Sequence, residues 1–447
     1  MVTRRKFIRN GALGATATAA ALSIPAPLWS RGSRILGAND RIRVGLIGCN
    51  GMGFSDLSSI LKLPDVEVAA LCDVDQGVLD RRIAQLTEAG HPKPKRYGDY
   101  RKLLGEKDID VVLIGTPDHW HCRQLLDALE AGKDVYCEKP IANSIEECDR
   151  MLQAVNSSGR MVQIGQWQRS QPHFVDAISF LRTGALGPVR LVKAWAYQGW
   201  MQPVPNLPDG PAPEGVDYDM WLGPAPMRPF NPNRFHFNFR WFWDYAGGLM
   251  TDWGVHLIDY ALYGMEATDP KSVLASGGKF AYADDASETP DTLQTVYEFE
   301  GFNLLWEHAT GIDGGNYGRN HGIAFIGNNG TLVLDRGGWE VIPEVGHESW
   351  RQLPDQPKME AIPLRTAAGS GLDLHTQNFV EAVRNRDSGI LKAPIEVGYH
   401  AARVSHMGNI AYKTGKKLHW DALQAAFTDA EANALMQATY HNGWELK

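Results

Sequence analysis

The feature that most constrains the fold is an apolar segment, Arg43–Ile47, that runs directly into the glycine-rich segment Gly48–Gly53. A strand, a glycine turn and a helix in this order form the phosphate-binding start of a dinucleotide-binding βαβ unit. Asp73 ends the next apolar segment, where a carboxylate accepts hydrogen bonds from the ribose hydroxyls and repels a 2′-phosphate. The sequence therefore predicts a site for NAD, with NADP the less favoured cofactor.

The turn departs from the usual Gly-x-Gly-x-x-Gly fingerprint, because Asn50 stands in place of its second glycine. Asn tolerates left-handed backbone better than most residues, and Gly51 beside it keeps the turn open. A purely structural turn is the alternative interpretation. The residues predicted to bind the cofactor here are Gly48, Asn50, Gly51, Met52, Gly53 and Asp73.

Strand and helix patterns alternate from this turn to about residue 165, which predicts a doubly wound parallel sheet. Beyond that point, after a Pro- and Gly-rich stretch at 203–232, several strand patterns follow one another with short turns between them. The chain is therefore predicted to hold a Rossmann α/β domain at 39–165 and an α+β domain with an open, mainly antiparallel sheet at 166–447.

The N-terminal segment Thr3–Arg9 contains the pair Arg4-Arg5 and resembles a twin-arginine export signal. Residues 11–24 are mostly Gly, Ala, Thr and Leu, too short and too weakly apolar to span a bilayer. Residues 1–38 are therefore predicted to be a signal and linker recognised by the twin-arginine export machinery. The mature protein is expected in the periplasm or otherwise exported, without a transmembrane anchor; a disordered basic N-terminus is the alternative.

The formal net charge is −8, and the leader contributes only positive charge, so the remaining chain is more acidic still. This argues against nucleic acid and anionic membrane surfaces as partners. The 5 cysteines are odd in number and fit no zinc or disulfide framework. His119 and His121 have no third ligand nearby in the sequence, so no metal site is predicted.

Four further motifs carry a resemblance to a known family: Thr116–His121, Tyr136–Pro140, Gln166–Arg169 and Gly247–His256. Together with the glycine turn they resemble the glucose–fructose oxidoreductase / inositol dehydrogenase (Gfo/Idh/MocA) family over roughly residues 40 to 420. The resemblance implies a Rossmann domain packed against an open antiparallel sheet, with the substrate in the cleft between them. It also implies a homo-oligomer built through the open sheet.

The resemblance implies roles for individual residues. Lys139 would contact the substrate and tune proton transfer, while Asp252 and His256 would form an Asp-x-x-x-His pair with His256 as the general base. These three are the predicted catalytic residues. The residues predicted to complete the cofactor site are Thr116, Pro117, His121, Glu138 and Gln166.

The residue types support these roles independently. Lys139 follows a strand of the parallel sheet, where side chains reach the ligand crevice. The spacing of Asp252 and His256 puts both on one helical face, so the carboxylate is expected to orient the imidazole and stabilise its charged form. Asp259, one turn further, is expected to be structural. The alternatives are a solvated surface Lys139 and a satisfied core His256.

Tryptophans gather near the segments that would line the cleft, and their faces pack well on pyranose rings. The predicted substrate contacts are Trp120, Arg169, Arg240 and Trp243. We therefore expect an exported NAD(P)-dependent oxidoreductase that acts on a hydroxyl of a sugar, glycoside or cyclitol and holds NAD tightly. An NAD-dependent glycosidase, acting by transient oxidation and elimination, and a non-catalytic sugar- and NAD-binding sensor are the alternatives.

Overall fold

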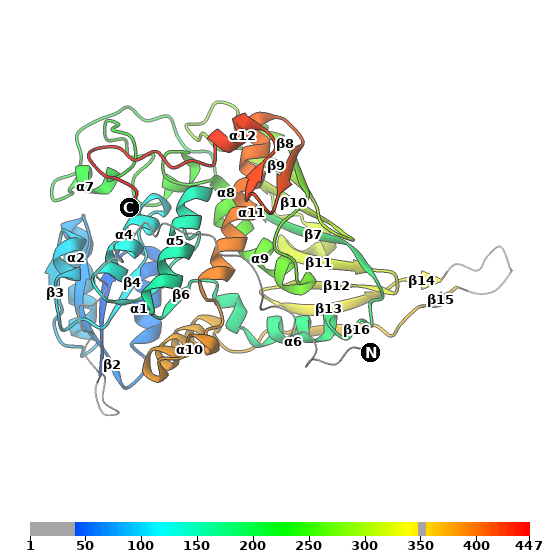
Figure 1. Ribbon diagram of the computed structural model, residues 1–447, viewed down its shortest axis with the longest axis horizontal. Helices are drawn as coiled ribbons and strands as arrows, with labels where there is room; N and C mark the ends of the chain where they lie inside the picture. The colour runs from blue at the N-terminus through cyan, green and yellow to red at the C-terminus, as the bar shows by residue number, and fades with distance from the viewer. Residues whose placement is uncertain (1–40, 347–354) are drawn as a thin grey trace, which may run out of the picture.

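A computed structural model describes residues 41–346 and 355–447, which form two sheets with helices between and around them (Figure 1). The predicted export signal at residues 1–38 lies outside the described residues. In Figure 1 the Rossmann sheet and its helices occupy the left side and the larger sheet the right. The predicted fold class, a Rossmann domain followed by an α+β domain, is confirmed.

The N-terminal sheet has six strands in the order β3-β2-β1-β4-β5-β6, and every neighbouring pair is parallel. Its strands are β1 (Ile42–Ile47), β2 (Val66–Cys72), β3 (Lys95–Tyr97), β4 (Val111–Ile114), β5 (Asp134–Cys137) and β6 (Val162–Ile164). The helices between them are α1 (Gly51–Ile60), α2 (Gln76–Glu88), α3 (Tyr100–Leu104), α4 (Asp118–Glu130) and α5 (Ile145–Ser158). The strand order reverses between β1 and β4, and ligands bind at the carboxyl ends of the strands at such a point.

The C-terminal sheet has ten strands in the order β16-β13-β12-β11-β7-β10-β9-β8-β17-β18. It is antiparallel except where β10 runs parallel to β7. Its strands are β7 (Val189–Gln198), β8 (Ser272–Gly278), β9 (Thr292–Glu298), β10 (Asn303–Thr310), β11 (His321–Gly327), β12 (Gly330–Asp335), β13 (Gly338–Pro343), β16 (Ile362–Thr366), β17 (Leu418–Asp421) and β18 (Ala426–Phe427). A separate pair consists of β14 (Val345–Gly346) and β15 (Gln356–Pro357).

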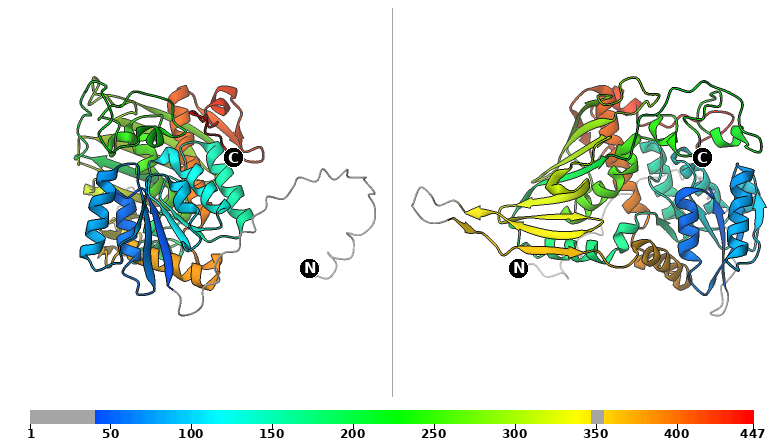
Figure 2. Two further views of the ribbon diagram at one scale, coloured as in Figure 1. Left: turned by 90° about the vertical axis from the view of Figure 1, so that its left-hand side faces the viewer. Right: turned by 180° about the vertical axis from the view of Figure 1, so that it is seen from behind.

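Helices pack on the side of this sheet that faces the Rossmann domain (Figures 1 and 2). The helices of this part of the chain are α6 (Pro172–Leu181), α7 (Tyr218–Leu222), α8 (Gly248–Asp252), α9 (Gly254–Met265), α10 (Gly371–Asn385), α11 (Ile395–Thr414) and α12 (Ala430–Ala434). Alternate residues of the strands enter the core beneath them, as in β9, where Leu293, Thr295 and Tyr297 are buried and the residues between are not. This alternation is what a sheet covered on one face requires.

Two late helices complete the core of the first domain. Phe379 and Val383 of α10 are fully buried in the same apolar cluster as Ile42 and Val44 of β1. Tyr399 of α11 belongs to the cluster on the other side of the sheet, with α4 and α5. The Rossmann sheet is therefore closed by segments that lie more than two hundred residues further along the chain.

The five cysteines are all buried and free, and each packs as a small apolar residue. Within residues 41–346 and 355–447, no helix has the length and apolarity needed to cross a membrane.

Candidate active site

The glycine turn owes its sequence to a close approach of three backbone segments. A Cβ added at Gly48, where φ is +85°, would lie 2.6 Å from the carbonyl carbon of Gly115, and one at Gly53 would lie 2.2 Å from the carbonyl oxygen of Gly48. Only glycine allows β1, α1 and β4 to meet so closely. Asn50 corrects the prediction: its backbone is extended (φ −105°), and the left-handed position is Gly51 (φ +49°).

Asp73 lies at the end of β2 with its carboxylate held by two backbone groups. The N–H of Cys49 donates to it at 2.8 Å, and the N–H of Asp75 donates at 3.0 Å. Burial raises the pKa of Asp73 above its usual value, although these two hydrogen bonds oppose the shift. The acceptor is thus fixed beside the glycine turn, as a ribose-binding carboxylate must be.

A cavity of about 630 Å³ joins the glycine turn to side chains of the second domain. From the Rossmann domain it is lined by Gly48, Asn50, Gly51, Met52, Asp73, Thr116, Pro117, Asp118, Trp120, Glu138 and Lys139, among others. From the rest of the chain it is lined by Trp167, His236, Phe237, Arg240, Asp252, Trp253, His256 and Arg336, among others. All three predicted catalytic residues and most of the predicted cofactor residues therefore line one space.

Lys139 and Asp252 form an ion pair across the boundary between the two domains. The Lys139 ammonium donates to the Asp252 carboxylate at 3.0 Å and to the Asp252 carbonyl at 2.9 Å. Nε of Arg240 lies 3.6 Å from the other carboxylate oxygen. Burial acts to raise the pKa of Asp252, but Lys139 and Arg240 outweigh it and hold the pKa below its usual value. Asp252 therefore stays ionised and fixes the Lys139 ammonium in the cavity.

The predicted partnership between Asp252 and His256 is wrong. The helix is interrupted at Trp253, so α8 ends at Asp252 and α9 begins at Gly254. The Asp252 carboxylate is engaged by Lys139, and Nδ1 of His256 is buried with no hydrogen-bond partner. Burial, followed by the positive charges of Lys139 and Arg336, lowers the pKa of His256 well below its usual value. The imidazole is therefore neutral at neutral pH.

Glu138, the residue before Lys139, forms a buried acidic pair with Asp56. An added Cβ at Gly165 would lie 2.1 Å from Oε1 of Glu138, so a glycine there leaves room for the carboxyl. Burial raises the pKa of Glu138 to about 7, against the opposing charge of Lys139, and burial also raises the pKa of Asp56. The pair consequently holds a proton near neutrality. Asp56 lies inside α1, and no motif in the sequence indicated it.

Asp118 is a second acid that the sequence motifs did not single out. It is the first residue of α4, so His119–His121 is helical. Burial raises the pKa of Asp118 to about 8 although Lys139 and Arg240 oppose the shift. Asp118 therefore presents a mostly protonated carboxyl to the cavity at neutral pH.

Three predicted cofactor residues do not line the cavity: Gly53, which packs against Gly48, and His121 and Gln166. The imidazole of His121 lies between the carbonyl oxygens of Thr116 and Pro140, 2.7 Å from each, and so ties together two segments that do line it. Gln166 donates from Nε2 to the carbonyl of Val255 at 3.2 Å, next to His256. Both side chains are buried and hold the lining in place.

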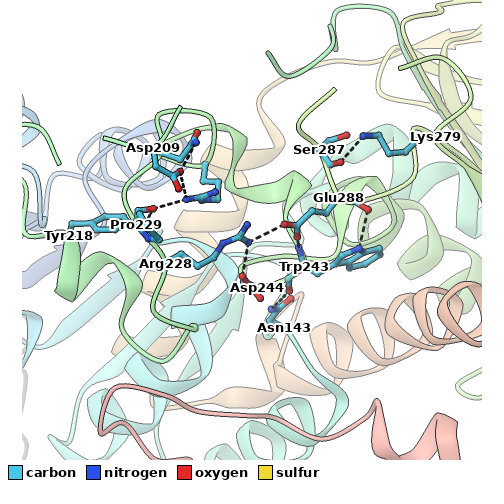
Figure 3. A network of polar contacts seen from close by, with 12 residues as sticks. Asn143, Asp209, Tyr218, Arg228, Pro229, Trp243, Asp244, Lys279, Ser287 and Glu288 are labelled. Carbon is cyan, nitrogen blue, oxygen red and sulfur yellow. Dashed lines mark hydrogen bonds and ion pairs between the residues drawn. The ribbon is translucent and has the colours of Figure 1, made fainter. Parts of the chain in front are cut away.

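Two predicted substrate residues lie outside the cavity lining as well. Arg169 forms an ion pair with Asp259, the carboxylate that the sequence predicted to be structural. The indole of Trp243 donates to the carbonyl of Glu288 at 3.1 Å (Figure 3). The same ring lies under the Lys413 ammonium. Their hydrogen-bonding groups are already paired, which corrects both predictions; Trp120 and Arg240 do line the cavity.

Arg336 is a further lining residue that no sequence motif indicated. It stands in the turn between β12 and β13, and its guanidinium lies 4.9 Å from the ring centre of Trp167 and 4.5 Å from that of Trp253. Its Nε is buried without a hydrogen-bond partner. In the part of the chain that the structure describes, no group of three or more His, Cys, Asp or Glu side chains could hold a metal ion.

Comparison with known proteins gives two family matches. Residues 42–166 match the GFO_IDH_MocA model, described as an oxidoreductase family with an NAD-binding Rossmann fold. Residues 191–446 match the model described as the C-terminal alpha/beta domain of that oxidoreductase family. The second match alone covers more than half of the chain.

Individual relatives are more distant. An alpha-N-acetylgalactosaminidase of Shewanella oneidensis is 37% identical over 159 residues, which is 34% of this chain and 34% of that protein. The match thus spans about a third of the relative's length. Levoglucosan dehydrogenase in complex with NADH and levoglucosan has a TM-score of 0.62 and 18% identity, covering 85% of this chain and 99% of the other. The WlbA dehydrogenase from Bordetella pertussis, in complex with NADH and UDP-GlcNAcA, has a TM-score of 0.61 and 17% identity over the same shares. These two structures share the fold.

Proposed function

The chain belongs to the Gfo/Idh/MocA oxidoreductase family, with an NAD-binding Rossmann domain, and from this we propose that it oxidises or reduces a hydroxyl of a sugar, glycoside or cyclitol. One observation supports the proposal above all others. The glycine turn, Lys139 and His256 line the same cavity, so a cofactor on the turn and a polyol beside the two side chains would share one space.

The residues at the turn suit a dinucleotide. The ten-residue helix α1 begins at Gly51 with no acidic side chain in its first turn and no side-chain cap from Asn50, so its first N–H groups can donate hydrogen bonds to a pyrophosphate. A Cβ at Gly51 would meet nothing within 4 Å, so the turn opens onto free space. Asp73 would bind the adenosine ribose, and Thr116, Pro117 and Glu138 would line the nicotinamide end. NAD, when bound, supplies a reversible hydride acceptor.

The protein's own side chains would handle the proton. Neutral His256 can accept the proton of the substrate hydroxyl, which a protonated imidazole could not. The Lys139 ammonium, anchored by Asp252, can donate a hydrogen bond to the same substrate oxygen as negative charge develops on it. The two side chains thus divide proton removal and charge stabilisation between them.

Replacing Asp73 by Ala should raise the Kd for NAD about 10- to 100-fold and reduce the preference for NAD over NADP. The substitution removes the acceptor for the ribose hydroxyls and also the charge that repels a 2′-phosphate. Titration of cofactor-free protein with both nucleotides measures the effect. Asp99→Ala removes a carboxylate from the loop after β3, outside the cavity, and should leave both affinities unchanged. An unaltered NAD:NADP ratio in Asp73→Ala would contradict this role.

Export with NAD already bound belongs to the same proposal. The twin-arginine route carries folded proteins, and compartments outside the cytoplasm offer little free nicotinamide cofactor, so NAD would have to stay bound through turnover. A second substrate, or the first after rearrangement, would then return the hydride. Denaturing the purified active protein should release nucleotide in near-stoichiometric amount. An active preparation that releases none would contradict tight binding.

An NAD-dependent glycosidase is the second candidate, supported by the match to the Shewanella alpha-N-acetylgalactosaminidase and by Asp118. Oxidation of a ring hydroxyl acidifies the neighbouring C–H, loss of that proton eliminates the aglycone, water adds to the unsaturated ketone that forms, and the ketone is reduced again by the returned hydride. The departing oxygen needs a proton, and the largely protonated Asp118 carboxyl lines the cavity. Mass spectrometry with a panel of glycosides separates the candidates: a product two mass units lighter indicates net oxidation, whereas free aglycone without keto sugar indicates the glycosidase.

A further inference from the structure

The cavity is lined by a cation, Arg336, that forms no ion pair with a carboxylate of the described residues. Among residues 41–346 and 355–447, Arg336 has neither an ion-pair nor a hydrogen-bond partner. Two other arginines of this sheet region differ in this respect, since Arg319, just before β11, pairs with Asp335, and Arg365 of β16 pairs with Asp176. A partly desolvated guanidinium without an anion is unfavourable unless a ligand supplies one.

Arg336 lines the cavity between two tryptophan rings. Trp167 and Trp253 hold the guanidinium by cation–π contact at 4.9 and 4.5 Å, and both rings also line the cavity. No group among residues 41–346 and 355–447 accepts a hydrogen bond from Arg336, so its N–H groups can bind a planar anion. Burial lowers the pKa of Arg336 to about 10, so the group is still charged at neutral pH.

The charges nearby do not compensate. Asp252, the ionised carboxylate of this part of the cavity, is already shared by Lys139 and Arg240. The acid at Asp118 is largely protonated at neutral pH and so adds little negative charge. The reacting region is therefore left with an excess of positive charge that a neutral sugar would not balance.

The cofactor phosphates have a separate binding place. The N–H groups of α1 and the turn at Gly51 belong to the Rossmann domain, while Arg336 lies on the hairpin β12–β13 of the other sheet. Arg336 acts electrostatically on both His256 and Asp252, which puts it beside the reacting groups. The missing anion is thus expected on the substrate.

We propose that the substrate is an acidic carbohydrate, a uronic acid or uronide, whose carboxylate is bound by the edge of the Arg336 guanidinium. This rests on the proposed function, since it specifies the polyol that the cavity takes. Guanidinium and carboxylate match in bidentate geometry and bind more strongly than neutral hydrogen-bonding pairs. The bound carboxylate also offsets the positive charge beside His256. It therefore favours transfer of the hydroxyl proton of the same substrate molecule to the imidazole.

The test compares matched substrates in the NAD-loaded protein. Methyl glucoside is paired with methyl glucuronide, and methyl galactoside with methyl galacturonide, in both anomers; glucose 6-sulfate is a further probe. We expect kcat/KM to favour the uronide by about 10- to 100-fold. In Arg336→Gln this ratio should fall toward one, and Arg336→Lys should recover it only in part because an ammonium lacks the bidentate edge. Arg365→Gln, another arginine stacked on a tryptophan but outside the cavity, is the matched control and should keep the ratio.

The possible results distinguish failure of the acidic-substrate assignment from failure of the proposed oxidoreductase function. Turnover of neutral glycosides at least as fast as of uronides would overturn the acidic substrate and leave the oxidoreductase proposal intact. A preference for the sulfate over the uronides would overturn the assignment of a carboxylate as the anion that Arg336 binds. If no sugar is turned over, calorimetry decides: uronide binding that Arg336→Gln abolishes supports the inference while the proposed reaction fails, and equal binding of both partners of a pair overturns it. Should Arg336→Gln not fold, Arg336→Lys and the wild-type ratios give the same decision.

Discussion

Replacing Lys139 by Ala is expected to lower turnover about 10²–10⁴-fold while NAD stays bound. The substitution removes the ammonium that Asp252 holds in the cavity, and with it the donor for the substrate oxygen. The glycine turn and Asp73 are untouched, so the cofactor site should persist. Single-turnover formation of bound NADH measures the rate, and nucleotide released on denaturation measures the cofactor content.

Two variants give this result its meaning. Lys139→Arg keeps a cation next to Asp252 but changes its reach and geometry, so it should restore only part of the rate. Lys413→Ala removes an exposed lysine whose ammonium lies over the ring of Trp243, outside the cavity, and should leave turnover near that of the wild type. Full activity in Lys139→Ala, with folding and NAD content intact, would contradict the role of Lys139 as donor to the substrate oxygen.

Replacing His256 by Asn should also reduce turnover by about 10²–10⁴-fold, and it should change the pH dependence. Burial and the charges of Lys139, Arg336 and His321 lower the pKa of His256 well below its usual value. A base with a lowered pKa stays unprotonated to lower pH, so the wild-type kcat/KM should lose its His256-dependent part only well below about pH 6.5. That acid limb should be absent in His256→Asn.

The acidic pair near the cofactor requires a control in this experiment, because the pKa of Glu138 is raised to about 7. Glu138→Gln removes that titration and leaves His256 in place. The limb assigned to His256 should therefore survive in Glu138→Gln and disappear in His256→Asn. A limb with the opposite behaviour would assign the pH dependence to the acidic pair and contradict His256 as the base.

The parts of the fold and site that could be predicted from the sequence are those with local causes. The turn Gly48–Gly53 follows from the steric contact of Gly48 with Gly115, and Asp73 and Lys139 follow strands whose carboxyl ends share one edge of a parallel sheet. Backbone sterics and strand direction are encoded in a few consecutive residues. The strand–helix alternation of the Rossmann domain was predictable for the same reason.

The errors arose where distant segments meet. Asp252 was assigned to His256 by its spacing, but its partner Lys139 comes from the other domain, 113 residues away. Arg336 occupies a hairpin turn with no motif, and only the folded chain sets it against Trp167 and Trp253. The parallel pairing of β7 with β10 inside an otherwise antiparallel sheet is likewise a non-local choice. Spacing along one segment contains no information about such contacts.

The packing of α10 and α11 against the first sheet has a consequence for biosynthesis. A nascent chain that has left the ribosome up to β6 lacks the apolar side chains, such as Phe379 and Tyr399, that cover both faces of that sheet. Domains ordinarily fold in turn as they are translated, but here the first must wait for the last fifth of the polypeptide. We therefore expect the first domain to complete its core only after α10 and α11 have been translated, and the segment up to β6, made alone, to expose apolar surface.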